Sequence, residues 1–242
     1  MRRTKFINVL VIIFIVLLIA TVVALVCAKG GKNKTAQSTA PAVTSTKPSF
    51  KIDPNDDLLI LVNYDNPIPD NYKPNLVKTQ YLEQRIDKRA AEPLNQLVAA
   101  CKKAGYQPLP CSGYRSKEEQ VQILEDKVQE YQNIGYSRAD AEKEARKWIT
   151  EPGESEHHTG LAMDIIDLDY QILDEKQKDT GTQKWLMEHC WEYGFVLRYP
   201  ENKKDITHID SESWHYRYVG KEHAKRMHDT GLCLEEYVEK YS

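Results

Sequence analysis

The prediction of the fold rests on two short stretches of this chain: Ser155-Glu156-His157-His158-Thr159-Gly160-Leu161-Ala162-Met163-Asp164 and, further along, Glu212-Ser213-Trp214-His215. Two histidines and one carboxylate are typical ligands of a hydrolytic zinc ion, because three protein ligands leave a fourth position open for water. A closed structural zinc site would use four protein ligands instead. The remaining Glu212 is then available as a general base, provided that a turn brings it beside His215.

The alternation of apolar and polar residues predicts a strand at the end of each stretch, while His157 lies in the loop before the first strand. In residues 161–166, Asp164 lies on the opposite face from Met163, because side chains of a strand alternate between its two faces. Asp164 should therefore point into a site and not into the core. Residues 214–219 form the second expected strand. In this strand the side chain of His215 lies on the opposite face from the aromatic side chains.

The rest of the chain mixes helical and extended patterns without a regular alternation of the two. This arrangement favours an α+β fold with a small antiparallel sheet that carries the zinc site and is flanked by helices. The further expected elements are extended segments at 58–62, 106–111 and 194–199, a helix at 92–105, two helices within 117–150 separated near Gly135 and Ser137, a helix at 183–193, and one or two helices within 222–241 broken at Gly231.

The N-terminus differs in composition from everything that follows. No residue between Lys5 and Lys29 is charged, and the apolar run is long enough to cross a bilayer core of roughly 30 Å. We expect residues 1–6 in the cytoplasm, a transmembrane signal anchor at 7–28, a flexible linker at 29–55 and the folded domain at 56–242. A cleaved signal peptide is the alternative, but its apolar region would usually be shorter.

The charge of the folded domain limits the kinds of partner it can bind. Of the 33 basic and 36 acidic residues, 8 and 1 lie in residues 1–55, so residues 56–242 carry 25 against 35, a net charge of −10. Nucleic acid and anionic lipid both require a basic surface, so this charge argues against them as partners of the domain.

Four cysteines lie in the expected domain, and none has the spacing of a metal knuckle or redox pair: Cys101, Cys111, Cys190 and Cys233. One or two disulfides are compatible with a domain outside the cell. Four buried free thiols are equally compatible with the sequence.

The joint pattern of motifs resembles the bacterial zinc D-alanyl-D-alanine carboxypeptidases and dipeptidases of the vancomycin-resistance type. The similarity rests on Ser-x-His-x-x-Gly-x-Ala-x-Asp from Ser155, on Glu-x-x-His from Glu212, and on four further segments that look like the family: 61–63, 112–116, 194–195 and 214–220. It covers nearly all of residues 56–242.

The resemblance implies a role for each matching residue. It makes His157, Asp164 and His215 the ligands of one zinc ion and Glu212 the general base. Arg115 would stabilise the oxyanion that forms beside the metal. Gln120 and Ser155 match positions that help to hold the peptide and its terminal carboxylate.

His158 and two arginines outside the motifs need separate assignments. His158 could replace His157 as a ligand, but only His157 has the motif spacing to Asp164, so we expect His158 to be supporting or exposed. Arg198 and Arg217 are expected to be partners in structural ion pairs.

The expected activity is removal of the C-terminal D-Ala from peptidoglycan stem peptides by a monomeric enzyme. The membrane anchor would hold the catalytic domain outside the cell, where this substrate lies. Cleavage of the L,D bond of tetrapeptide stems is the enzymatic alternative. A catalytically silent wall-binding domain is the alternative from another class; it would be expected to lack a ligand or the base, and none is missing here.

Overall fold

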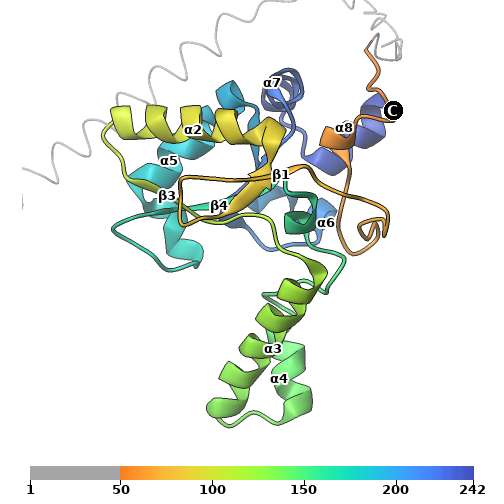
Figure 1. The fold of residues 1–242 in the computed structure, drawn as a ribbon, viewed down its shortest axis with the longest axis vertical. Coiled ribbons are helices and arrows are strands. Elements are labelled where there is room, and N and C mark those ends of the chain that lie inside the picture. Colours follow the sequence, from red (N-terminus) through yellow and green to blue (C-terminus); the bar gives the residue numbers. More distant parts are fainter. Residues whose placement is uncertain (1–49) are drawn as a thin grey trace, which may run out of the picture. The chain divides into compact units, whose positions relative to one another are not determined.

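The computed structural model describes residues 50–242, and it has the expected α+β architecture (Figure 1). Four strands form an antiparallel sheet in the order β3-β4-β6-β5, and β1 and β2 form a separate two-stranded sheet. The strands are β1 (Leu76–Lys78), β2 (Arg85–Asp87), β3 (Pro108–Ser112), β4 (Ala162–Asp167), β5 (Phe195–Tyr199) and β6 (Glu212–Tyr218). The helices are α2 (Lys88–Lys103), α3 (Lys117–Asn133), α4 (Arg138–Ala145), α5 (Gly181–His189), α6 (Lys204–Thr207), α7 (Lys221–Thr230) and α8 (Leu234–Tyr241), with short 3-10 turns η1 (Asp57–Leu59), η2 (Glu156–Thr159), η3 (Glu175–Asp179), η4 (Cys190–Tyr193) and η5 (Glu201–Lys203).

The two faces of the four-stranded sheet have different roles. Met163 lies opposite Tyr216 in the pairing of β4 with β6, and both side chains are buried in a core shared with α2 and α5. The next pair along the same two strands is Asp164 and His215. Because side chains alternate between faces, this second pair lies on the other face of the sheet. The expected alternation in both strands is therefore confirmed.

Helices α7 and α8 pack on a second apolar cluster at the β5 edge of the sheet. Val196 of β5 and Val219, just after β6, contribute to this cluster, and Tyr237 of α8 is completely buried in it. Gly231 ends α7 with a positive φ of 65°, so the expected break between two C-terminal helices is confirmed.

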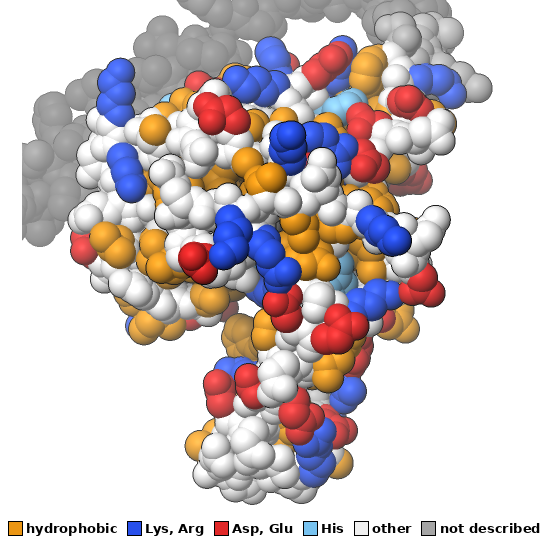
Figure 2. Space-filling view, viewed as in Figure 1, with side chains coloured by type: hydrophobic (Ala, Val, Ile, Leu, Met, Phe, Trp, Pro, Cys, Tyr) orange, Lys and Arg blue, Asp and Glu red, His pale blue; other side chains and the backbone are white. Residues whose placement is uncertain are grey.

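Helices α3 and α4 form a hairpin that projects away from the sheet (Figure 1). Ser116 and Glu119 form a capping box at the start of α3, and Ser137 caps α4 as its sequence pattern indicates. The hairpin has its own small core around Val128. Figure 2 shows acidic and basic side chains interspersed along it, and Arg138 forms ion pairs with glutamates of both helices.

Several element boundaries differ from the sequence-based predictions. Leu58 belongs to the 3-10 turn η1 and not to an extended segment, and its carbonyl oxygen accepts a hydrogen bond from the buried Arg217 at 2.9 Å. Helix α2 begins at Lys88, earlier than expected, because the Asp87 side chain caps it by accepting from the Arg89 backbone N–H. Pro93 lies inside this helix.

The expected anchor at 7–28 and most of the expected linker at 29–55 lie outside the described residues. Within residues 50–242, none of the helices combines the length and apolar character needed for a membrane span. The four cysteines of this region are free thiols, and three of them are buried: Cys101, Cys190 and Cys233. Burial raises the pKa of the Cys190 thiol to about 12, so this thiol is protonated at neutral pH.

Candidate metal centre

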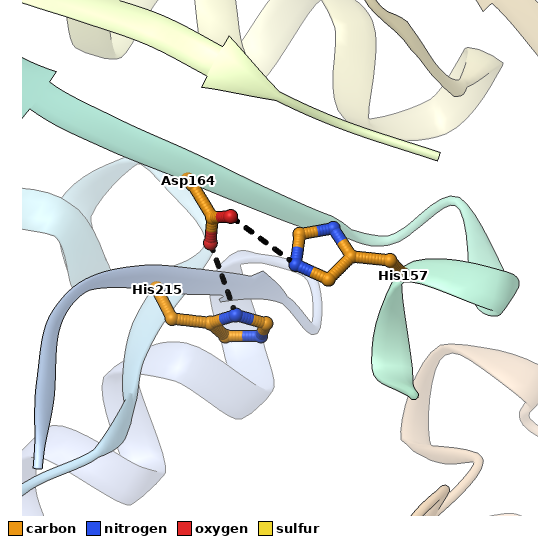
Figure 3. Close-up of side chains that lie close together, drawn as sticks. All are labelled: His157, Asp164 and His215. Atoms are coloured by element: carbon orange, nitrogen blue, oxygen red, sulfur yellow. Dashed lines mark ion pairs between the residues drawn. The ribbon is translucent and has the colours of Figure 1, made fainter. Parts of the chain in front are cut away.

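Three segments bring one side chain each to a common point on the face of the sheet opposite Met163: His157 from η2, Asp164 from β4 and His215 from β6 (Figure 3). Asp164 is paired directly with His215 across the strands. One oxygen of Asp164 lies 3.4 Å from His157 Nε2, and the other lies 3.1 Å from His215 Nδ1. The potential ligand atoms all lie within 4.8 Å of one another.

A second contact fixes the orientation of each histidine ring. His157 Nδ1 lies 2.7 Å from the carbonyl oxygen of Gly113, to which it donates, so its Nε2 faces Asp164. His215 makes its outer contact through Nε2, which lies 3.3 Å from a carboxylate oxygen of Glu156. Such outer contacts select the tautomer of a metal-binding histidine and hold its ring in place.

The properties of His157 and Asp164 fit a zinc ion. Burial, together with the positive charge of Arg115, lowers the pKa of His157 to about 4, so its imidazole is neutral at pH 7, the form that binds a metal. Asp164 Oδ1 is buried and has no hydrogen-bond partner, which leaves a lone pair free for coordination. Two imidazoles and one carboxylate form a donor set that zinc prefers.

Glu212 lies beside this cluster because β6 is irregular. Leu197 pairs with Tyr216 and Tyr199 pairs with Glu212, so one residue of β5 lies opposite three residues of β6. This bulge places Glu212 Oε2 3.7 Å from His215 Nδ1. A bulge within the strand, and not the expected turn, therefore brings both side chains to one point.

Burial raises the pKa of Glu212 to about 7, and the negative charge of Asp164 adds to this effect while His215 opposes it. The side chain is still 26% exposed, so water can reach it. A carboxylate with a pKa near neutrality is suited to accept and release protons.

Arg115 also reaches the cluster. Its Nη2 donates to Asp164 Oδ2 at 3.0 Å and to Ser112 Oγ at 2.8 Å, while Nε donates to the same hydroxyl at 3.0 Å. The side chain is 20% exposed. A guanidinium held in this way places a fixed positive charge beside the potential metal ligands.

His158 does not belong to the ligand cluster. Its Nε2 accepts from the Gly153 backbone N–H at 2.9 Å, so its proton is on Nδ1, which donates to the Arg115 carbonyl oxygen at 2.7 Å. The side chain is buried, and its hydrogen bond to the Arg115 carbonyl oxygen links the segment of Arg115 to that of His157. The structure thus places His157, and not His158, in the cluster of potential ligands.

The two residues expected to bind substrate lie close to the site but make contacts within the protein. Gln120 is buried, and its amide nitrogen donates to the Thr150 carbonyl oxygen at 2.9 Å. Its side-chain oxygen lies 3.5 Å from Arg115 Nη1. Ser155 caps η2 by accepting from the His157 backbone N–H. Their roles toward substrate stay predictions.

Glu156 is the residue of the site that the sequence reasoning did not identify. Its side chain is buried and accepts hydrogen bonds from Arg198 and Arg217, each at 2.7 Å. The expected ion-pair roles of these two arginines are thus confirmed. The sequence signal that could have identified Glu156 is the presence of these two arginines in apolar strands. Buried arginines need a carboxylate partner.

A family model described as D-alanyl-D-alanine carboxypeptidase, VanY, matches residues 83–221, which is more than half of the chain. The chain belongs to this family. A D-alanyl-D-alanine carboxypeptidase of Enterococcus faecalis (strain ATCC 700802 / V583) is 43% identical over 182 residues, which cover 74% of this chain and 65% of that protein. The chain therefore aligns with slightly less than two thirds of the length of this relative.

Two solved structures are among those similar to this chain. A mutant of the vancomycin-resistance D,D-pentapeptidase VanY in complex with Zn(II) has a TM-score of 0.66 and 41% identity, covering 75% of this chain and 99% of that one. The LD-carboxypeptidase LdcB has a TM-score of 0.67 and 39% identity, covering 78% and 89%. The zinc in the first structure agrees with the donor set found here.

Proposed function

We propose that this protein is a zinc-dependent D-alanyl-D-alanine carboxypeptidase that removes the C-terminal D-Ala from peptidoglycan stem peptides. One observation carries the proposal: a half-buried glutamate and a fixed arginine lie beside a cluster of two histidines and one aspartate. This is the set of groups that metal-assisted peptide hydrolysis requires. Membership of the VanY family supports the D-Ala substrate.

His157, Asp164 and His215 would hold the zinc ion, which when bound supplies a Lewis acid for the scissile carbonyl and lowers the pKa of water. Glu212 accepts the proton of the attacking water at its carboxylate and passes it to the amine of the leaving D-Ala. Arg115 places its guanidinium where the carbonyl oxygen becomes negative.

Replacing Glu212 tests this assignment. The variant Glu212→Ala should retain zinc, since the three ligands are unchanged, but should lose a factor of about 10²–10⁴ in the rate of D-Ala release, the usual contribution of a general base. Zinc content is measured by elemental analysis and D-Ala by mass spectrometry. Turnover like that of the unaltered protein would refute the mechanism.

A second candidate activity is cleavage of the L,D bond in tetrapeptide stems. The observation in its favour is the similarity to the LD-carboxypeptidase LdcB, which is nearly as high as that to the D,D-enzyme. The purified protein should be given pentapeptide and tetrapeptide stems and the products weighed. Release of D-Ala from the pentapeptide alone supports the D,D-activity, and release from the tetrapeptide alone supports the alternative.

We also propose that residues 7–28 anchor the protein in the cell membrane, with residues 56–242 outside as a monomeric catalytic domain. The uncharged apolar run in the sequence supports the anchor, and the location of stem peptides in the wall supports the orientation. Protease treatment of intact cells tests it. Cleavage of the domain is the expected result, and full protection would contradict it.

A further inference from the structure

The buried carboxylate of Glu156 has no part in the proposed reaction, although it lies directly behind a zinc ligand. Only 1% of the residue is exposed, and one of its oxygens lies 3.3 Å from His215 Nε2. His215 Nδ1, on the other edge of the same ring, faces Asp164 at 3.1 Å. The ring of His215 is therefore held between two carboxylates.

Two arginines hold the other oxygen of Glu156. Arg198 Nε and Arg217 Nη1 each donate to Glu156 Oε1 at 2.7 Å, and the side chains of all three residues are completely buried. The two guanidinium groups within hydrogen-bond distance balance the charge of this buried carboxylate. Paired in this way, the carboxylate acts only as an acceptor.

The remaining charges of this network come from the C-terminal helix. Glu235 of α8 accepts from both terminal nitrogens of Arg198, at 2.8 and 2.5 Å. Two glutamates thereby balance two arginines. Arg217 donates its remaining contacts to the carbonyl oxygens of Leu58 and Ile60, each at 2.9 Å. Segments near both ends of the described chain are thus joined to the back of His215.

We propose that Glu156 is a positioning residue that presents His215 to zinc through Nδ1. An ionised acceptor next to Nε2 keeps the proton on that nitrogen, which leaves the Nδ1 lone pair free and directed at the site. A fixed negative charge behind the ring also makes it a stronger ligand. This role deepens the proposed function and rests on it, because it presupposes zinc at the cluster.

The test measures zinc affinity, not activity. Zinc is titrated against a competing chelator, at a temperature where all proteins are folded, for the unaltered protein, Glu156→Gln and the matched control Glu154→Gln. Glu156→Gln should bind zinc about 10- to 100-fold more weakly, the usual effect of losing such a partner. The control, two residues away, has no contact with His215 and should stay within about twofold, since only packing at the surface changes.

If Glu156 had a purely structural role, its replacement would lower the melting temperature. The zinc affinity and the visible spectrum of the Co²⁺-substituted protein would then be unchanged. A Glu156→Gln affinity within twofold of the unaltered protein overturns the proposal. If that variant does not fold, Glu156→Asp keeps the charge for both arginines but withdraws the oxygen from His215, and the same two outcomes apply.

A measurement on the unaltered protein needs no variant to fold. In the zinc-bound protein with ¹⁵N-labelled histidine, His215 should show a protonated Nε2 and a coordinated Nδ1. Coordination through Nε2 would overturn the proposal. Failure of the unaltered protein to bind zinc would instead refute the proposed function, so the two failures are distinguishable.

Discussion

Replacing Arg115 by alanine should reduce kcat/KM for D-Ala release by about three orders of magnitude while zinc stays bound. The guanidinium is mostly buried, so an effective dielectric constant of about 20 applies to its interaction with the oxyanion. A unit charge at about 4 Å then contributes roughly 4 kcal/mol, which corresponds to a factor of about 10³ in rate. The loss of a single oxyanion donor in other enzymes has a similar effect.

The assay is release of D-Ala from an acylated peptide ending in D-Ala-D-Ala, with zinc content measured in parallel. Arg115→Lys should recover only part of the loss, because an ammonium cannot reproduce the forked contacts with Ser112 and Asp164. Arg85→Ala is the matched control: Arg85 pairs with Glu119 at 2.6 Å near the surface, and its loss should change kcat/KM less than threefold. An Arg115→Ala variant that keeps its zinc and stays within threefold of the unaltered enzyme would refute the assigned role.

Three further outcomes follow from the contacts of the site. Gly113→Ala should destabilise the fold by about 1–3 kcal/mol and weaken zinc binding, because the new Cβ would lie 2.3 Å from the Arg85 carbonyl oxygen and displace the carbonyl that orients His157; denaturant melts and zinc titration measure both, and an unchanged midpoint would contradict it. Removing zinc that was present at a thousandfold its Kd should lower the free energy of unfolding by about 4 kcal/mol, and equal stability with and without a chelator would argue against a zinc site. Between pH 4.5 and 7 the free energy of unfolding of the zinc-free protein should fall relative to that of Glu212→Gln, because the raised pKa of Glu212 lets the folded state keep a proton that the unfolded state loses; parallel pH profiles would contradict this expectation.

Local sequence patterns were sufficient where the deciding contacts are themselves local. The alternation in β4 placed Asp164 opposite Met163 because neighbouring side chains of a strand must point to opposite faces. The cap at Ser137 begins a helix through a hydrogen bond that reaches only three residues ahead. The donor types of the metal site follow from the chemistry of imidazole and carboxylate alone.

Local sequence patterns did not predict the structure where a backbone group forms a hydrogen bond with a distant residue. The segment at Leu58 is apolar enough for a strand, but its carbonyl oxygen is bound by Arg217, more than 150 residues away, and the chain turns there instead. Periodicity also cannot show a bulge, since the bulge arises from the pairing of β6 with β5. The position of Glu212 beside His215 depends on that pairing.

The sequence by itself determined the class of the fold and the expectation of an apolar anchor at 7–28, and its motifs, through their resemblance to the family, named His157, Asp164 and His215 as candidate ligands. Only the tertiary structure decided which edge of each histidine faces the site. That choice depends on Gly113 and Glu156, which packing brings to His157 and His215 from 44 and 59 residues away in the chain. Contacts over such separations come from the register of strands and the burial of paired charges, which no local pattern encodes.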